Sequence, residues 1–153
     1  MPKNNELYQM AIDYVVNLPY SRFLGLKFEY ARDDEQVFSV NWQPGIVGNA
    51  VQHTMHHSVL TTLVDVAGGA AVAACLSEPH AVVTLDLRMD FLAALPNQAE
   101  ECCFAHAKCH SLCDHIASVR TVCFCPPQTQ PVVYATATYV CTPLSEEKKA
   151  KFL

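Results

Sequence analysis

The sequence predicts an α+β protein in which a curved antiparallel sheet wraps around a long central helix. The first sign is an apolar run over residues 55–76, which leaves no wide polar face and is typical of a helix buried on most sides. The second is that apolar and polar residues alternate along most of the remaining chain, as they do in strands. A sheet has to bury one face, and the central helix is the only apolar element long enough to cover it. We therefore expect a single domain over residues 1–153.

Two elements and a loop are expected before the central helix. Apolar residues recur at spacings of three and four over residues 3–17, which indicates an amphipathic helix that ends before Pro19. Residues 23–42 alternate on both sides of Asp33-Asp34 and predict a β-hairpin. Residues 43–54 contain a proline and two glycines and predict a loop, after which Ser58 is the expected N-cap of the central helix.

Four strands are expected after the central helix, over residues 81–91, 101–113, 115–125 and 131–141, and a frayed helix is expected at 145–153. The first of these strands alternates cleanly, so its apolar and polar side chains are expected on opposite faces. The apolar set is Val83, Leu85, Leu87, Met89 and Phe91, and the polar set is Thr84, Asp86, Arg88 and Asp90. Within the helix, Gly68-Gly69 costs about 1 kcal/mol per glycine relative to alanine, and it predicts the close approach of another backbone.

Charge and hydropathy exclude two classes of protein. The net charge is −5, and the one short basic cluster, near the C-terminus, is balanced by Glu146 and Glu147, which argues against a nucleic-acid surface. The run over residues 59–76 is shorter than the roughly 20 apolar residues of a bilayer span and includes Asp65, so no membrane span is expected.

The cysteines give an expectation about location. The N-terminus lacks the apolar core of a signal peptide, so we expect a cytoplasmic protein in which all eight cysteines are reduced. Several cysteines and histidines crowd residues 106–125, but their spacings do not match the usual zinc patterns. Buried apolar cysteines are the expectation there, and a structural zinc site is the alternative.

Asp65 is the candidate catalytic residue because it is a carboxylate in the middle of an apolar helix. Burying an ionised carboxylate without partners costs several kcal/mol, and chemistry is the usual reason to keep one. The structural alternative is a carboxylate satisfied by a nearby threonine or backbone donor. His53, His56 and His57 precede the helix, where exposed amides favour developing negative charge. These histidines are alternatively plain loop residues, or His53 and His57 chelate a metal.

The helical position of Asp65 bears on how it could work with His56. Asp65 follows His56 by nine residues, about 900° of helical rotation, so the two would face opposite ways if both were helical. Either His56 lies in the loop before the helix, or the site is completed by a second subunit.

Three motifs carry a resemblance to a known family. Gly48-Asn49 is followed by His56 seven residues after the asparagine, and Asp65 comes nine residues after His56. A strand motif follows, with Thr84, Asp86, Leu87, Arg88, Asp90, Phe91 and Leu92. In these motifs the chain resembles the hotdog-fold acyl-CoA thioesterases of the PaaI-like group, in the branch that acts on medium- and long-chain acyl-CoA.

The chain departs from the family pattern at three places. His57-Ser58 replaces two glycines, Ala93-Ala94 replaces an Arg-Pro ending, and Asp114 lies in a loop that often supplies a basic residue near the CoA phosphates.

The resemblance implies a hydrolase of fatty acid metabolism that converts an acyl-CoA or acyl-carrier thioester to the free acid and a thiol. Asp65 would be the general base or the nucleophile, and the amides near His57 and Ser58 would hold the carbonyl oxygen. Asn49 and His56 would orient the carbonyl or water, and Thr84, from the partner subunit's strand, would place the water. No metal or organic cofactor is implied.

The resemblance also implies an assembly, a homodimer or a dimer of dimers (homotetramer). The strand after the central helix would join the two sheets edge to edge, with Arg88 against Asp86 or Asp90 of the partner. Two alternative functions on the same fold stay open, a hotdog hydratase or dehydratase and a non-catalytic module that binds acyl-CoA.

Overall fold

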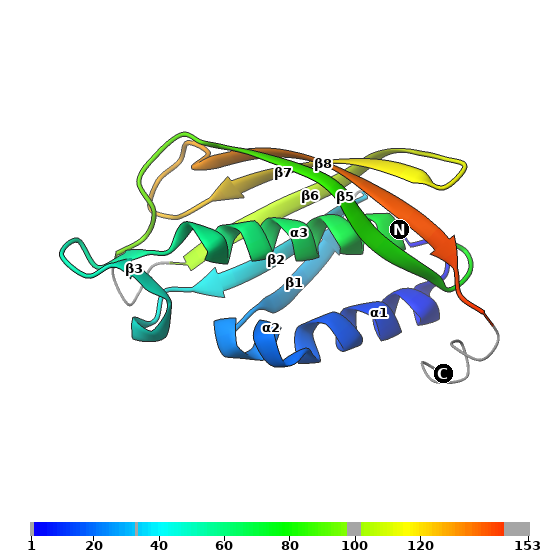
Figure 1. Cartoon of the computed structure of the whole chain (residues 1–153), viewed down its shortest axis with the longest axis horizontal. Helices are drawn as coiled ribbons and strands as arrows, with labels where there is room; N and C mark the ends of the chain where they lie inside the picture. The colour runs from blue at the N-terminus through cyan, green and yellow to red at the C-terminus, as the bar shows by residue number, and fades with distance from the viewer. Residues whose placement is uncertain (1, 33, 98–101, 146–153) are drawn as a thin grey trace.

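The chain folds into one curved antiparallel sheet that wraps around the helix α3 (His57–Ala73), as Figure 1 shows. This computed structural model describes residues 2–32, 34–97 and 102–145. The six strands lie in the order β1-β2-β6-β7-β8-β5, and all the pairs are antiparallel. Their bounds are β1 Lys27–Arg32, β2 Glu35–Asn41, β5 His80–Phe91, β6 Cys102–Cys113, β7 Ile116–Phe124 and β8 Val133–Pro143. The predicted fold class and all six of these strands are confirmed, whereas the helix expected at 145–153 lies almost wholly outside the described residues.

The core lies between α3 and the concave face of the sheet. Leu60, Leu63, Val64 and Ala67 of α3 are fully buried, as expected for a helix without a wide polar face. The helix α1 (Asn5–Asn17) packs along α3 and buries Tyr8 and Ile12 (Figure 1). No helix of the described residues is long and apolar enough to cross a membrane.

A second short helix, α2 (Pro19–Leu24), corrects the expectation that the hairpin begins at residue 23. Proline is favourable at the first position of a helix, and Gly25 ends α2 with a φ of 69°, a left-handed conformation that glycine adopts without strain. The hairpin therefore starts four residues later than expected, with β1 at Lys27.

The loop expected over residues 43–54 has structure of its own. A short 3-10 helix η1 (Pro44–Ile46) leads into a small ribbon of β3 (Val47–Asn49) and β4 (Thr54–Met55). The ribbon is tied to the rest of the fold by backbone hydrogen bonds from Met55 N to Pro96 O and from His56 N to Ile46 O, both 2.8 Å. The ribbon thereby fixes the direction in which the chain enters α3.

Strand β5 does not alternate cleanly, which corrects the expected division of its faces. A β-bulge lies between Thr84 and Asp86, and a bulge moves the following side chains to the opposite face. Leu87 and Met89 pack against the core as expected, but Val83 and Leu85 are 55% and 58% exposed. Thr84, expected on the opposite face from Leu87, points toward α3 as Leu87 does.

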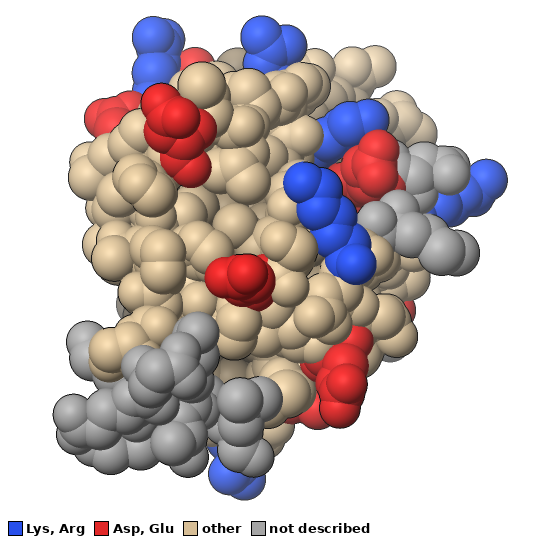
Figure 2. Space-filling model, turned by 90° about the vertical axis from the view of Figure 1, so that its right-hand side faces the viewer, with Lys and Arg blue, Asp and Glu red and all other residues tan. Residues whose placement is uncertain are grey.

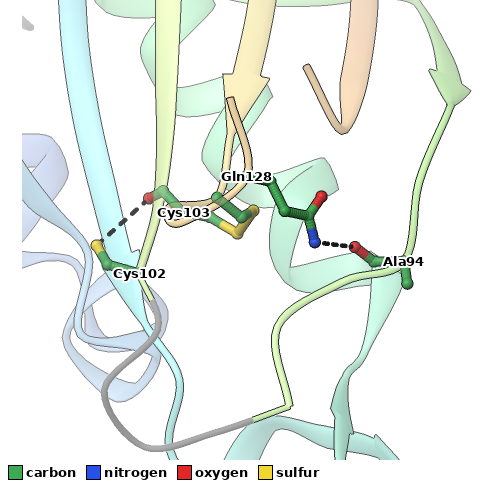
Figure 3. The surroundings of a disulfide bond; sticks show 5 residues. Ala94, Cys102, Cys103 and Gln128 are labelled. Atoms are coloured by element: carbon green, nitrogen blue, oxygen red, sulfur yellow. Dashed lines mark hydrogen bonds between the residues drawn. A yellow bond between two sulfur atoms is a disulfide. The ribbon is translucent and has the colours of Figure 1, made fainter. Parts of the chain in front are cut away.

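A disulfide between Cys103 and Cys125 shows that the expectation of eight reduced cysteines is wrong (Figure 3). In the pairing of β6 with β7, Phe104 lies opposite Phe124. Cys103, just before Phe104, and Cys125, just after Phe124, therefore lie across from each other. The two Cα atoms are 4.3 Å apart, at the short end of the distances that disulfides bridge. Beside the disulfide, Gln128 Nε2 donates to Ala94 O at 3.5 Å, so the ends of β7 and β5 are joined there as well.

We expect reduction of this disulfide to lower the free energy of unfolding by about 3 kcal/mol, because the bond closes a loop with a sequence separation of 22 residues. Urea unfolding with and without a reductant measures the difference. The double variant Cys103→Ala/Cys125→Ala is the control and should not respond to the reductant. Eight titratable thiols in the denatured, unreduced protein would contradict the prediction, since six are expected.

Charged side chains do not gather in one patch on the face of the molecule shown in Figure 2. Acidic and basic residues are scattered there among other residues, and the chain as a whole carries a net charge of −5. This face has no continuous basic surface of the kind that binds a phosphate backbone.

Candidate active site

Asp65 lies near the middle of α3 and faces one cross-strand pair of the sheet. Thr84 of β5 and Tyr139 of β8 are directly opposite each other in the ladder, and both reach the Asp65 carboxylate. The Thr84 hydroxyl donates to Asp65 Oδ1 at 2.6 Å. This contact is made within one chain, whereas the family resemblance led us to expect Thr84 to act from a partner subunit.

Tyr139 is a second partner of Asp65, and it was not among the residues singled out from the sequence. Its hydroxyl lies 3.1 Å from the Asp65 carbonyl oxygen and 3.4 Å from Oδ1. Burial and the negative charge of Asp65 raise the pKa of Tyr139 well above its usual value, so the hydroxyl stays protonated and acts as a donor. A tyrosine on the buried face of a strand needs a hydrogen-bond partner, and that requirement was the signal available in the sequence.

The two oxygens of the Asp65 carboxylate are not equivalent. Oδ1 receives the hydroxyl contacts of Thr84 and Tyr139, whereas Oδ2 has no hydrogen bond among the described residues. No buried side-chain nitrogen or oxygen atom of the described residues lacks a hydrogen bond. Oδ2 has no hydrogen bond, so it is not one of the buried atoms. It is therefore open to solvent and available to a ligand.

The start of α3 is capped by His56, not by Ser58 as expected. His56 has extended backbone angles, and its Nδ1 accepts a hydrogen bond from Ser58 N at 3.1 Å and lies 2.7 Å from Ser58 Oγ. The imidazole thus satisfies one of the unpaired amides of the first turn, as an N-cap side chain does. Because Nδ1 accepts, the neutral ring carries its hydrogen on Nε2, which is free to donate.

The amide of His57 has no hydrogen-bond partner among the described residues. The neighbouring amides of His56, Ser58 and Val59 donate to Ile46 O, His56 Nδ1 and His56 O, and no such partner is found for His57 N among the described residues. The His57 ring packs edge-on against Phe91 at the end of β5, with 4.6 Å between ring centroids. The His57 side chain is thereby turned toward β5.

Asn49 shapes the turn that precedes this helix start. Its Oδ1 accepts from the amides of Val51 and Gln52 at 3.0 and 3.1 Å, and its Nδ2 donates to Gln52 Oε1 at 3.3 Å. Next to it, a side chain at Gly48 would place Cβ 2.7 Å from His56 Cα, so only glycine lets His56 pack here. The motif Gly48-Asn49 therefore positions the helix entrance.

The predicted site residues thus fall into two groups within one chain. Asp65 and Thr84 form the first, and Asn49, His56, His57 and Ser58 form the second. Asp65 lies eight residues along α3 from His57, which corresponds to about 12 Å at the helical rise of 1.5 Å per residue. One small functional group cannot contact both Asp65 and the His57 amide of the same chain.

Among the residues that the structure describes, no three His, Cys, Asp or Glu side chains are arranged to hold a metal ion.

Comparisons with known proteins show what the chain is similar to. The family model of the thioesterase superfamily matches residues 52–108, which include the start of α3, Asp65 and Thr84. Over these residues the chain is similar to the thioesterase superfamily. Its predicted resemblance is confirmed by the medium/long-chain acyl-CoA thioesterase YigI of Escherichia coli K12, which is 30% identical over 93 residues. The Salmonella typhimurium protein of the same name is 29% identical over 92 residues. In both cases the match covers 52% of this chain and 59% of the relative.

Solved structures of thioesterases have the same fold as this chain. A thioesterase family protein from Silicibacter pomeroyi has a TM-score of 0.78 and 18% identity, with 90% of this chain and 99% of that chain covered. Thioesterase HI1161 from Haemophilus influenzae has a TM-score of 0.77 and 17% identity, with 87% and 89% covered. These likenesses extend over most of the sheet and α3, far beyond the residues matched by the family model.

Proposed function

We propose that the chain hydrolyses acyl-CoA thioesters to the free acid and CoA. The observation that carries the proposal is Asp65, a carboxylate on the apolar helix of a thioesterase-superfamily fold, with one oxygen held by Thr84 and the other open. An ionised carboxylate oxygen can take a proton from water or attack a carbonyl carbon directly. As nucleophile, Asp65 would place Oδ2 at the carbonyl carbon; as general base, it would place Oδ2 at the water that attacks this carbon.

The amide of His57 is the donor that would stabilise the developing negative charge of the thioester oxygen. It lies at the N-terminus of α3, where the helix dipole also favours negative charge, and it has no other partner among the described residues. Ser58 N is less suited to this role than the resemblance implied, because it donates to His56. His56 Nε2 and the remaining hydrogen of Asn49 Nδ2 are the further donors that would orient the carbonyl or CoA.

Since Asp65 and His57 of one chain are too far apart, we infer that each site combines Asp65 of one copy with His57 of a second. Strand β5 is one of the two edges of the sheet and has no neighbour on its outer side among the described residues. Exposed edges pair with other chains. Val83, Leu85 and Leu92 are more than half exposed along it. A two-fold axis at β5 would run the two α3 helices antiparallel and bring each helix start toward the middle of the other.

The charged residues of β5 are available to this pairing. Arg88 contacts Asp90 of its own strand at 3.2 Å, and both side chains are exposed. In an antiparallel edge-to-edge dimer, Arg88 of each copy would contact Asp90 of the other copy in place of its own. A dimer of dimers is compatible with the same edge.

A thiol-release assay tests the proposed activity. The wild-type protein is given a panel of saturated acyl-CoA thioesters from short to long, with enoyl-CoA and 3-hydroxyacyl-CoA beside them. We expect release of free CoA from the saturated thioesters, with medium and long chains preferred as the names of the two curated relatives suggest. Hydration or dehydration without thiol release, or tight binding of acyl-CoA without turnover, would overturn the proposal in favour of a hydratase or a binding module.

A further inference from the structure

Tyr139 makes a contact with Asp65 that the hydrolytic mechanism does not by itself require. It is 2% exposed and lies on the inward face of β8, among Ala135, Ala137 and Cys141. Its ring reaches over α3, so that the hydroxyl touches both the backbone oxygen and Oδ1 of Asp65. A phenylalanine would fill the same space in this apolar surrounding, so the hydroxyl is the feature that needs an explanation.

Gly68 makes this contact possible. A Cβ at position 68 would lie 2.1 Å from Tyr139 Oη and 2.9 Å from Cζ, distances at which Tyr139 would have to move. Gly69, in contrast, has no heavy atom of a neighbour within 4 Å of such a Cβ. The predicted close approach at the glycine pair therefore occurs at Gly68 alone, and the approaching group is a side chain and not a backbone. A glycine inside a helix costs about 1 kcal/mol of stability relative to alanine. Here the missing side chain leaves the space that the Tyr139 hydroxyl occupies.

The hydroxyl groups of Thr84 and Tyr139 approach Asp65 on the same oxygen. Thr84 Oγ1 lies 2.6 Å and Tyr139 Oη 3.4 Å from Oδ1, and Tyr139 Oη is also 3.1 Å from the backbone oxygen. The tyrosine has one hydrogen and donates to one of these oxygens at a time, but both acceptors belong to Asp65. Asp65 is thereby held from two strands, and of its carboxylate oxygens only Oδ2 has no hydrogen-bond partner among the described residues.

We propose that Tyr139, admitted by Gly68, is a positioning residue that orients the Asp65 carboxylate so that Oδ2 faces the thioester. This inference rests on the proposed function of Asp65 and extends it to a residue that does not touch the substrate. A carboxylate held by Thr84 alone has a remaining torsional freedom that the second hydroxyl removes. Misplacement of a catalytic group by about 1 Å can cost up to 100-fold in rate, so the contact has a measurable effect on turnover.

Three variants test this proposal: Tyr139→Phe, Gly68→Ala and the two combined. We expect Tyr139→Phe to lower kcat about 10-fold while KM changes less than 2-fold, because the lost hydroxyl positions the base and does not bind substrate. Gly68→Ala should lower kcat similarly by displacing the hydroxyl. In the Tyr139→Phe background, Gly68→Ala should lower kcat far less, because the group that it displaces is already absent.

The matched control is Tyr134→Phe, which removes a hydroxyl from the exposed face of the same strand and should leave kcat unchanged. Thermal unfolding of each variant separates loss of turnover from loss of the fold. An unchanged kcat in folded Tyr139→Phe overturns the positioning role, as do strictly additive effects of the two substitutions. Asp65→Asn and the wild type are assayed alongside. If the wild type releases no thiol, the proposed function fails, and if Asp65→Asn keeps full turnover, the catalytic role of Asp65 fails. Loss of turnover in Asp65→Asn together with an active Tyr139→Phe rejects only the positioning role.

Discussion

Asp65→Asn is expected to lower the turnover of acyl-CoA by at least about 100-fold, which is the usual contribution of a general base. The amide is nearly the same size as the carboxylate and can still accept the Thr84 hydroxyl, so the packing of α3 against β5 should be kept. It cannot take a proton from water or attack the thioester. The initial rate of CoA release, measured with a saturated acyl-CoA at a concentration above KM, gives the effect.

The control for this substitution is Asp13→Asn, which makes the same chemical change at an exposed position of α1. It should keep wild-type turnover. If Asp65→Asn folds and also keeps wild-type turnover, Asp65 is a structural carboxylate satisfied by Thr84 and Tyr139, which was the alternative reading of the sequence.

His57→Pro is expected to lower kcat by about 100- to 1,000-fold, because proline has no amide hydrogen and the oxyanion loses its donor. His57 is the first residue of α3, a position at which proline is favourable. The preceding His56 has φ −69° and ψ 136°, an extended conformation that proline requires of the residue before it. The helix should therefore still begin at residue 57.

His57→Ala separates the amide from the imidazole. Like His57→Pro, this variant loses the ring contact with Phe91, but it keeps the amide hydrogen. It should therefore lose far less turnover than His57→Pro. Equal losses in the two variants would instead assign the effect to the imidazole ring, and the oxyanion role of the His57 amide would be wrong. Steady-state kinetics of both variants, with circular dichroism to check the helix content, make the comparison.

The parts of the fold that the sequence predicted are those set by local periodicity. The apolar run of α3 and the alternation of the sheet strands depend only on which residues recur at which spacing, and these elements are confirmed. The short helix α2, by contrast, has too few residues for a periodic signal and depends on Pro19 and Gly25 at its ends. The bulge in β5 leaves no mark in an alternating sequence, yet it decides that Thr84 faces Asp65.

The candidate site divides in the same way. Asp65 stands out in the sequence because a carboxylate in an apolar helix is rare, and His56 because it precedes that helix. Thr84 and Asn49 were found through the family resemblance. Tyr139 was missed because a tyrosine in a strand is ordinary, and only the three-dimensional structure shows that its ring crosses Gly68. The Cys103–Cys125 disulfide was missed because it depends on the register of β6 and β7. Both depend on contacts between residues that are far apart in the chain.

The central claim is that Asp65 of one copy and the His57 amide of another act on the same thioester. It is tested most directly with a dimer that joins one Asp65→Asn chain to one His57→Pro chain, purified through two different affinity tags. One of its two sites combines an intact Asp65 with an intact His57 amide, so this dimer should recover about half of the wild-type turnover although each parent is inactive. If the mixed dimer forms but shows no more turnover than its parents, the two groups do not share a site across the interface.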